Sequence, residues 1–84
     1  MNKIMLSEYN KSLGPLIDVR DPLKYAKKHD PRSTNIYVDK ILLNYKMLDK
    51  NKTYYIICEN GILSKRVVNY LNYLGYKAIQ VIEK

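Results

Sequence analysis

The sequence is poor in several residues that mark whole classes of protein. Its 84 residues include one cysteine, one histidine, three glycines and three prolines, with no tryptophan or phenylalanine. A lone cysteine, Cys58, excludes an intramolecular disulfide framework, and Cys58 with His29 is too small a set for a structural zinc cluster. We therefore expect no metal and no other cofactor. With 46% hydrophobic residues, the chain is expected to form one globular domain over residues 1–84.

Long apolar runs are also absent. The longest wholly aliphatic stretch is residues 41–43, far short of the roughly 20 residues that cross a membrane. Residues 1–6 lack the apolar core and cleavage site of a secretory signal. We expect a chain without membrane contact in the reducing cytoplasm, with Cys58 as a free thiol.

Acidic residues are scarce, with 8 Asp and Glu against 15 Lys and Arg, which gives a net charge of +7. Such a charge attracts nucleic acid, anionic surfaces or acidic molecules. The lysines are nevertheless spread along the chain, which is also rich in Asn, Ile and Tyr, and A/T-rich codons account for much of this bias. No basic block marks a nucleic-acid arm. Nucleic-acid binding is therefore disfavoured, and an anionic donor or an acidic protein partner is the better expectation.

Short apolar segments alternate with amphipathic ones in the first half of the chain. Residues 16–19 predict a buried strand, and Asp21 followed by Pro22 predicts a helix start, with the helix running to Lys28. Residues 35–38 could form a short strand. Apolar residues at a helical spacing predict a second helix over residues 39–48.

The second half repeats this alternation. Residues 53–58 are β-branched or aromatic and predict the strongest strand, and a last strand is expected over residues 78–82. Between them, Ser64 is the expected cap of a helix that ends before Gly75. The apolar face of that helix is Val67, Val68, Leu71 and Leu74. The alternation predicts an α/β fold, a small parallel sheet with flanking helices. Residues 4–12 are too short to assign, although Ser7 could cap a helix.

Cys58 has a position typical of a reactive group. It ends the strongest strand and opens the loop before a helix, where open α/β sheets gather functional groups. The backbone N–H groups of such a loop and the positive end of the helix favour an anionic sulfur, and hence a nucleophile. By position alone, a small buried residue that finishes a core strand is an equally good interpretation.

Several motifs together resemble the rhodanese domain, the fold of sulfurtransferases that carry sulfur as a cysteine persulfide. Residues 16–22 resemble the family's L-I-D-V-R-[ED]-P opening, and residues 31–36 resemble its H-I-P-G-A-x-N-I segment. Three further matches are the Tyr25 and His29 pair, Cys58-x-x-Gly61-x-x-Ser64 for C-x-x-G-x-R-S, and Leu74-Gly75-Tyr76 for L-G-Y-x-x-V. The resemblance extends from about residue 16 to residue 82.

The resemblance implies nucleophilic catalysis by Cys58. The thiolate attacks the outer sulfur of a donor and becomes a persulfide. An acceptor thiol or cyanide then removes that sulfur. The implied donors are a protein persulfide, a polysulfide or thiosulfate. The active-site loop is Glu59, Asn60, Gly61, Ile62, Leu63 and Ser64. Phosphatases of this fold have an arginine where this chain has Ser64, so a phosphatase is disfavoured.

The loop departs from the family pattern at two positions. Leu63 replaces the arginine that would hold an oxyanion, and Glu59 adds a negative charge beside Cys58. Both changes disfavour thiosulfate and favour a persulfide or polysulfide donor, although Lys65 and Arg66 could partly compensate. They also keep open an alternative function, a binding or regulatory module of rhodanese fold without turnover. The family usually continues beyond the position of Lys84, so we expect a domain shortened at its C-terminus.

Three residues outside the loop match family positions, and two of them, Asp18 and Arg20, match positions close to the active-site loop. Asp18 and Arg20 match a pair at the end of a strand, where they could steady the active-site loop. The alternative for these two residues is an exposed ion pair worth about 0–1 kcal/mol. For His29, stabilisation of a helix end is expected rather than general-base catalysis.

Overall fold

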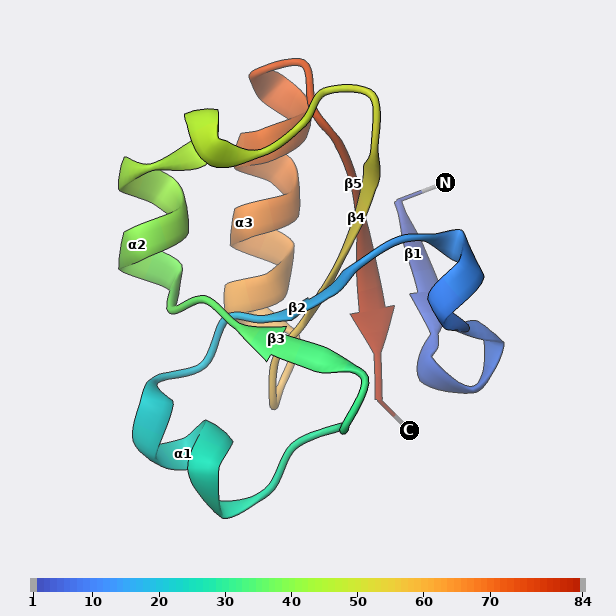
Figure 1. Cartoon of the computed structure of the whole chain (residues 1–84), viewed down its shortest axis with the longest axis vertical. Helices are drawn as coiled ribbons and strands as arrows, with labels where there is room; N and C mark the ends of the chain where they lie inside the picture. Colours follow the sequence, from blue (N-terminus) through green and yellow to red (C-terminus); the bar gives the residue numbers. More distant parts are fainter. Residues whose placement is uncertain (1, 84) are drawn as a thin grey trace.

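The structure is a computed structural model that describes residues 2–83. One parallel sheet of five strands has the order β1-β5-β4-β2-β3 (Figure 1). The strands are β1 (Lys3–Met5), β2 (Leu16–Asp18), β3 (Ser33–Asn35), β4 (Thr53–Ile57) and β5 (Lys77–Ile82). The helices are α1 (Pro22–Lys27), α2 (Val38–Leu43) and α3 (Ile62–Tyr73), with 3-10 turns at Leu6–Glu8, Lys11–Leu13 and Tyr45–Met47. This confirms the expected α/β fold. Within residues 2–83, no helix has the length and apolar character to span a membrane.

The central strand β4 is buried on both faces of the sheet. Tyr54 and Ile56 point to the side where α2 and α3 pack together (Figure 1). Tyr55 and Ile57 point to the other side, where they pack with Tyr9 of the N-terminal segment. Alternate side chains leave opposite faces of a strand, and a strand covered on both faces carries an almost continuous apolar run. This explains why β4 is the clearest strand in the sequence.

Most of the predicted boundaries are confirmed to within one or two residues. The predictions at residues 16–19, 53–58 and 78–82 correspond to β2, β4 and β5. Asp21 caps α1 as expected, because its carboxylate accepts hydrogen bonds of 3.0 Å from the N–H groups of Leu23 and Lys24. Gly75 follows α3 with a φ of +92°, the left-handed conformation expected at a helix end.

The N-terminal segment contains a strand that the sequence did not reveal. β1 pairs with β5, with Lys3 opposite Gln80, and so forms one edge of the sheet. Three residues carry too little periodicity to be recognised, and only pairing with β5 makes them a strand. The expected cap at Ser7 is wrong. Ser7 lies inside the first 3-10 turn, and Glu8 accepts the Met5 N–H at 2.8 Å instead.

The middle of the chain also differs from the prediction. The third strand lies at Ser33–Asn35 rather than residues 35–38, and Val38 already belongs to α2. The helix expected over residues 39–48 ends at Leu43, where the Asn44 backbone and side chain both donate to Lys40 O. A 3-10 turn follows, in which Tyr45 packs against the core while Met47 is exposed, and Leu48 after it is buried. The apolar spacing therefore predicted burial correctly but could not detect a break in the helix.

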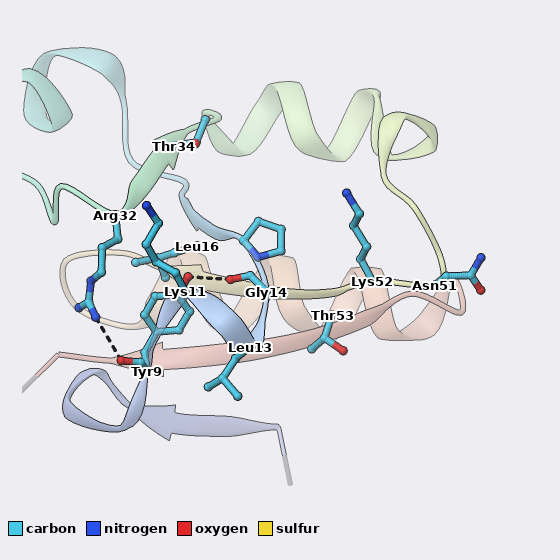
Figure 2. A pocket seen from close by; sticks show the side chains of 11 residues that line it. Tyr9, Lys11, Leu13, Gly14, Leu16, Arg32, Thr34, Asn51, Lys52 and Thr53 are labelled. Atoms are coloured by element: carbon cyan, nitrogen blue, oxygen red, sulfur yellow. Dashed lines mark hydrogen bonds between the residues drawn. The ribbon is translucent and has the colours of Figure 1, made fainter.

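Tyr9 and Arg32 hold the N-terminal segment against the sheet (Figure 2). The Tyr9 hydroxyl donates to Gly14 O at 2.6 Å, and Arg32 Nη1 donates to Tyr9 O at 3.1 Å. The Arg32 guanidinium also lies 5.0 Å from the centre of the Tyr9 ring. A pair with Asp30, 2.7 Å between Nη2 and Oδ2, orients this guanidinium and lowers the pKa of the Asp30 carboxyl.

Gly14 stands where no side chain fits. Its φ is +150°, and a Cβ atom there would collide with the backbone carbonyl of Thr53. We expect Gly14→Ala to lower the free energy of unfolding by about 2–3 kcal/mol, because backbone must shift to relieve the overlap. Urea titration measures this. The matched control is Gly75→Ala, where a Cβ meets only Lys50 Nζ at 3.6 Å and the cost is about 1–2 kcal/mol from φ alone. Equal losses of unfolding free energy in the two variants would contradict a collision at Gly14.

The Asp30–Arg32 pair predicts a pH-dependent stability. The pKa of Asp30 is lower in the folded chain than in the unfolded chain, so the unfolded state binds more protons and stability falls with falling pH. The contribution of the pair to the free energy of unfolding is complete above about pH 5, and it is lost as the pH falls through the pKa that Asp30 has in the folded chain. We expect Asp30→Asn to be less stable than the native chain in urea titrations at pH 7, with the difference shrinking toward pH 3. A constant difference across this range would rule the linkage out.

Candidate active site

Cys58 follows β4 at the carboxyl edge of the sheet. It lies at the meeting point of two cavities of about 260 and 270 Å³. The first is bounded by α1, by Tyr37 and by the loop after Cys58, and the second by that loop and the end of β5. Only 5% of Cys58 is exposed, so a reagent reaches its sulfur through these cavities. The thiol thus lies after β4 and before α3, the position expected from the sequence.

The first turn of α3 supplies hydrogen-bond partners for the sulfur. The Ser64 N–H donates to Cys58 Sγ at 3.2 Å, and Ser64 Oγ lies 3.2 Å from the same sulfur. The first N–H groups of a helix have no partner within the helix, so they are free to bind an anion. Sulfur anions at Cys58 therefore have two donors available from Ser64, its N–H and its O–H.

The expectation that Ser64 caps the helix is wrong. α3 begins at Ile62, after Gly61, whose φ of +83° is left-handed. Asn60 Oδ1 accepts the Ile62 N–H at 3.1 Å and so closes the turn. Because the helix starts before Ser64, that residue stands inside the first turn and faces the sulfur. The remaining loop residues, Glu59 and Leu63, line the cavity beside Cys58.

Gln80 on β5 joins the site, and sequence reasoning missed it. Its side chain is 8% exposed, and Nε2 donates to Gly61 O at 2.9 Å and to Ser64 Oγ at 3.0 Å. Nothing in the local sequence marks this glutamine. The register of β5 on β4, with Gln80 opposite Ile56, brings it beneath the loop.

Asp18 and Arg20 form a bidentate pair in which Asp18 is buried and the Arg20 side chain is 16% exposed. Asp18 is 3% exposed and accepts from Arg20 Nε at 3.1 Å and Nη2 at 2.9 Å. This hydrogen bonding raises the pKa of Arg20 above its usual range. Arg20 Nη2 also donates to Lys28 O at 2.6 Å, and Arg20 lines the Cys58 cavity. The exposed-pair interpretation is therefore wrong, while support of the active-site loop stays a prediction.

The two cations that could compensate for the missing loop arginine lie outside the cavities at Cys58. Lys65 and Arg66 line a separate hollow beyond Gly61 and neither of the cavities at Cys58. Their backbone lies just after the loop, but the helix turns their side chains away. The cations that do line the first site cavity are Arg20, held by Asp18, and Lys24, whose Nζ is 3.4 Å from Glu59 Oε1. Lys24 was not identified from the sequence.

His29 stabilises the end of α1, as expected. Its Nδ1 lies 2.6 Å from Tyr25 O, and its ring stacks on the Tyr25 ring with centroids 3.8 Å apart. It does not line the cavities at Cys58. Among residues 2–83, no group of three or more His, Cys, Asp or Glu side chains is arranged to hold a metal ion.

A larger hollow of about 650 Å³ lies away from Cys58 (Figure 2). It is lined by Tyr9, Arg32 and residues around the amino ends of β2 and β4, among them Lys11 and Lys52. It contains no nucleophilic thiol and none of the loop residues. The smaller cavities are the better candidate site because Cys58 and the start of α3 meet there.

Known proteins are similar to this chain in sequence and in fold. The family model for the rhodanese-like domain matches residues 3–84. YtwF of Bacillus subtilis, whose name assigns it provisionally to the sulfurtransferases, is 36% identical over 66 residues. That match covers 79% of this chain and 64% of YtwF. A tRNA sulfurtransferase of Pyrobaculum aerophilum is 38% identical over 63 residues, which are 75% of this chain and 13% of that protein. The chain thus spans less than two thirds of these relatives.

A solved structure of a rhodanese-related protein from Thermoplasma volcanium is similar along almost the whole chain. The TM-score is 0.88 at 26% identity, and the match covers 98% of this chain and 84% of that one. The motif resemblance, the five-stranded parallel sheet and the match of the family model over residues 3–84 agree. The chain belongs to the rhodanese-like domain family.

Proposed function

We propose that the chain is a rhodanese-type sulfurtransferase or sulfur carrier in which Cys58 forms a persulfide. The observation that carries this proposal is the pairing of the Cys58 thiol with the N–H of Ser64, 3.2 Å away, at the floor of a cavity. A sulfur in this position can be reached by a donor and is stabilised as an anion by the start of α3. The sulfurtransferase names of the relatives support the same chemistry.

The reaction proceeds in two balanced displacements. In the first, the Cys58 thiolate attacks the outer sulfur of a donor persulfide, forming a new S–S bond and breaking that of the donor, which leaves as a thiolate. In the second, an acceptor thiolate attacks the outer sulfur of the Cys58 persulfide and carries it away as a new persulfide. Cys58 returns to the thiolate form, and no net oxidation or reduction of the protein occurs. This is covalent catalysis through an enzyme-bound intermediate.

A persulfide or polysulfide is the proposed donor, and a thiol the proposed acceptor. Thiosulfate carries a sulfonate-like head that needs a free cation, but Leu63 is apolar and packs against the core. Arg20 forms an ion pair with Asp18, and Lys24 forms one with Glu59. The cavity therefore offers no unpaired cation among its described lining residues. An acidic protein partner and a cytoplasmic location stay predictions from composition.

The alternative is a binding or regulatory module of the same fold without turnover. Its support is the rim of the cavity, where Ile62 is 69% exposed and Leu63 replaces the expected arginine. Exposed apolar side chains at the edge of the cavity suit contact with another protein as well as passage of a small donor. The two functions differ in whether Cys58 is required.

The first test is sulfur loading of the thiol. After incubation with a persulfide donor, the protein is expected to gain the mass of one sulfur atom in intact-mass spectrometry, reversed by an excess of acceptor thiol. Cys58→Ser, which preserves size and removes the nucleophile, is expected to gain nothing. A native chain that never gains sulfur would reject the proposed transfer and favour the binding module, whose partner binding should survive Cys58→Ser.

The second test restores a cation. Leu63→Arg is expected to increase the rate of sulfur transfer from thiosulfate to cyanide by about tenfold, since one charge-assisted hydrogen bond to an oxyanion contributes about 1.5–3 kcal/mol. Transfer from a persulfide donor should change little. Ile62→Arg is the matched control because Ile62 lines the same cavity and is more exposed. A gain of equal size in both variants would show that general charge, rather than position, governs thiosulfate use.

A further inference from the structure

Gln80 is one of three buried polar or charged residues in the described chain, together with Asp18 and Ser64. Its amide nitrogen lies between the loop and the first turn of α3, 2.9 Å from Gly61 O and 3.0 Å from Ser64 Oγ. Buried amide groups in proteins are normally hydrogen-bonded, because burying a polar group without a hydrogen-bond partner costs free energy. A glutamine directly behind the serine that touches the nucleophile is therefore a candidate for a role in the chemistry.

We propose that Gln80 is a positioning residue that turns the Ser64 hydroxyl toward Cys58 and thereby increases the reactivity of the thiol. The inference rests on the proposed function only in taking Cys58 as the reacting group. It adds a residue from a distant strand that acts through Ser64 and does not touch the sulfur donor.

The orientation of the Gln80 amide follows from its partners. Gly61 O is a carbonyl and can only accept, so the amide group that faces it must be the NH₂ and not the oxygen. The same nitrogen then directs its second hydrogen to Ser64 Oγ. One lone pair of Oγ is used in this way, and the amide cannot accept a hydrogen bond from Ser64 at that position.

This orientation leaves the Ser64 hydroxyl hydrogen free to point toward the sulfur. Oγ already accepts from Gln80, and the sulfur lies 3.2 Å from Oγ. When Cys58 is a thiolate, it accepts from both the O–H and the N–H of Ser64, and each donor is satisfied. When Cys58 is a thiol, its S–H donates to the second lone pair of Oγ, and the Ser64 hydroxyl hydrogen no longer points at the sulfur. The network therefore favours the thiolate, the form that attacks sulfur.

Burial strengthens this chain of hydrogen bonds. Ser64 is fully buried and Gln80 is 8% exposed, so water does not replace either partner. The charged groups that line the cavities at the sulfur are Glu59 in the loop, Glu83 after β5, and Arg20, Asp21 and Lys24 from the α1 side. None of them is altered in the variants below, so their fields act equally on all of them.

A simpler role for Gln80 is to hold Gly61 and the loop in place. A double-mutant cycle separates the two roles, because only an effect through the hydroxyl disappears when the hydroxyl is removed. The variants are Gln80→Met, which keeps the length and loses both donors, Ser64→Ala, and the two combined. The readout is the rate of Cys58 alkylation by iodoacetamide from pH 5 to pH 10, with urea unfolding to confirm that each variant is folded.

Gln80→Met is expected to slow alkylation at pH 7 by about fivefold, the effect of losing one hydrogen bond of ordinary strength. The whole rate profile should move to higher pH, with the same rate at its alkaline plateau. In the Ser64→Ala background, the same change should slow alkylation by less than about twofold. Equal effects in the two backgrounds would overturn the proposal and leave Gln80 as a support of the loop.

Gln80→Glu provides an independent check. Its ionised carboxylate would accept the Ser64 hydroxyl hydrogen and turn it away from Cys58, so alkylation at pH 7 should be slower than in Gln80→Met. A Gln80→Glu variant as reactive as the native chain would also overturn the proposal. Sulfur loading is measured in parallel. Failure of loading in the native chain rejects the proposed transfer alone, while the alkylation cycle still decides the role of Gln80.

Discussion

The hydrogen bond from the Ser64 N–H to Cys58 Sγ depends on a change of direction between β4 and α3. The chain leaves the strand at Cys58, turns through the left-handed Gly61, and enters the helix with the Ser64 N–H aimed back at the sulfur. If the helix began at Ser64, as its sequence suggests, that N–H would not lie inside the first turn. The remaining features of the site hold this turn in place or shape access to it.

A parallel sheet brings the supports together, because the carboxyl ends of its strands meet at one edge. β2 ends beside β4, so Arg20, held by Asp18, reaches the wall of the Cys58 cavity. β5 lies on the other side of β4 and presents Gln80 beneath the loop. The ion pair and the buried amide thus flank the same turn from opposite sides. Both satisfy polar groups that would otherwise be costly to bury.

Electrostatics at the site are set by pairing rather than by the net charge of +7. Arg20 is bound to Asp18 and to a carbonyl, Lys24 lies against Glu59, and Lys65 and Arg66 line another hollow. The rim instead offers the apolar side chains of Ile62 and Leu63. The excess of lysine therefore says little about this cavity, and the donor proposed for it is one that does not need an oxyanion site.

The sequence by itself determined the elements that carry strong local signals. Short runs of aliphatic, β-branched or aromatic residues marked β2, β4 and β5, Asp21 marked the start of α1, and the loop motif singled out Cys58. Only the tertiary structure decided the strand β1, the break after Leu43, the true start of α3 and the presence of Gln80 at the site. The reason is physical: local patterns record burial and turn preference, whereas register between distant strands and the direction of a side chain arise only when the sheet assembles.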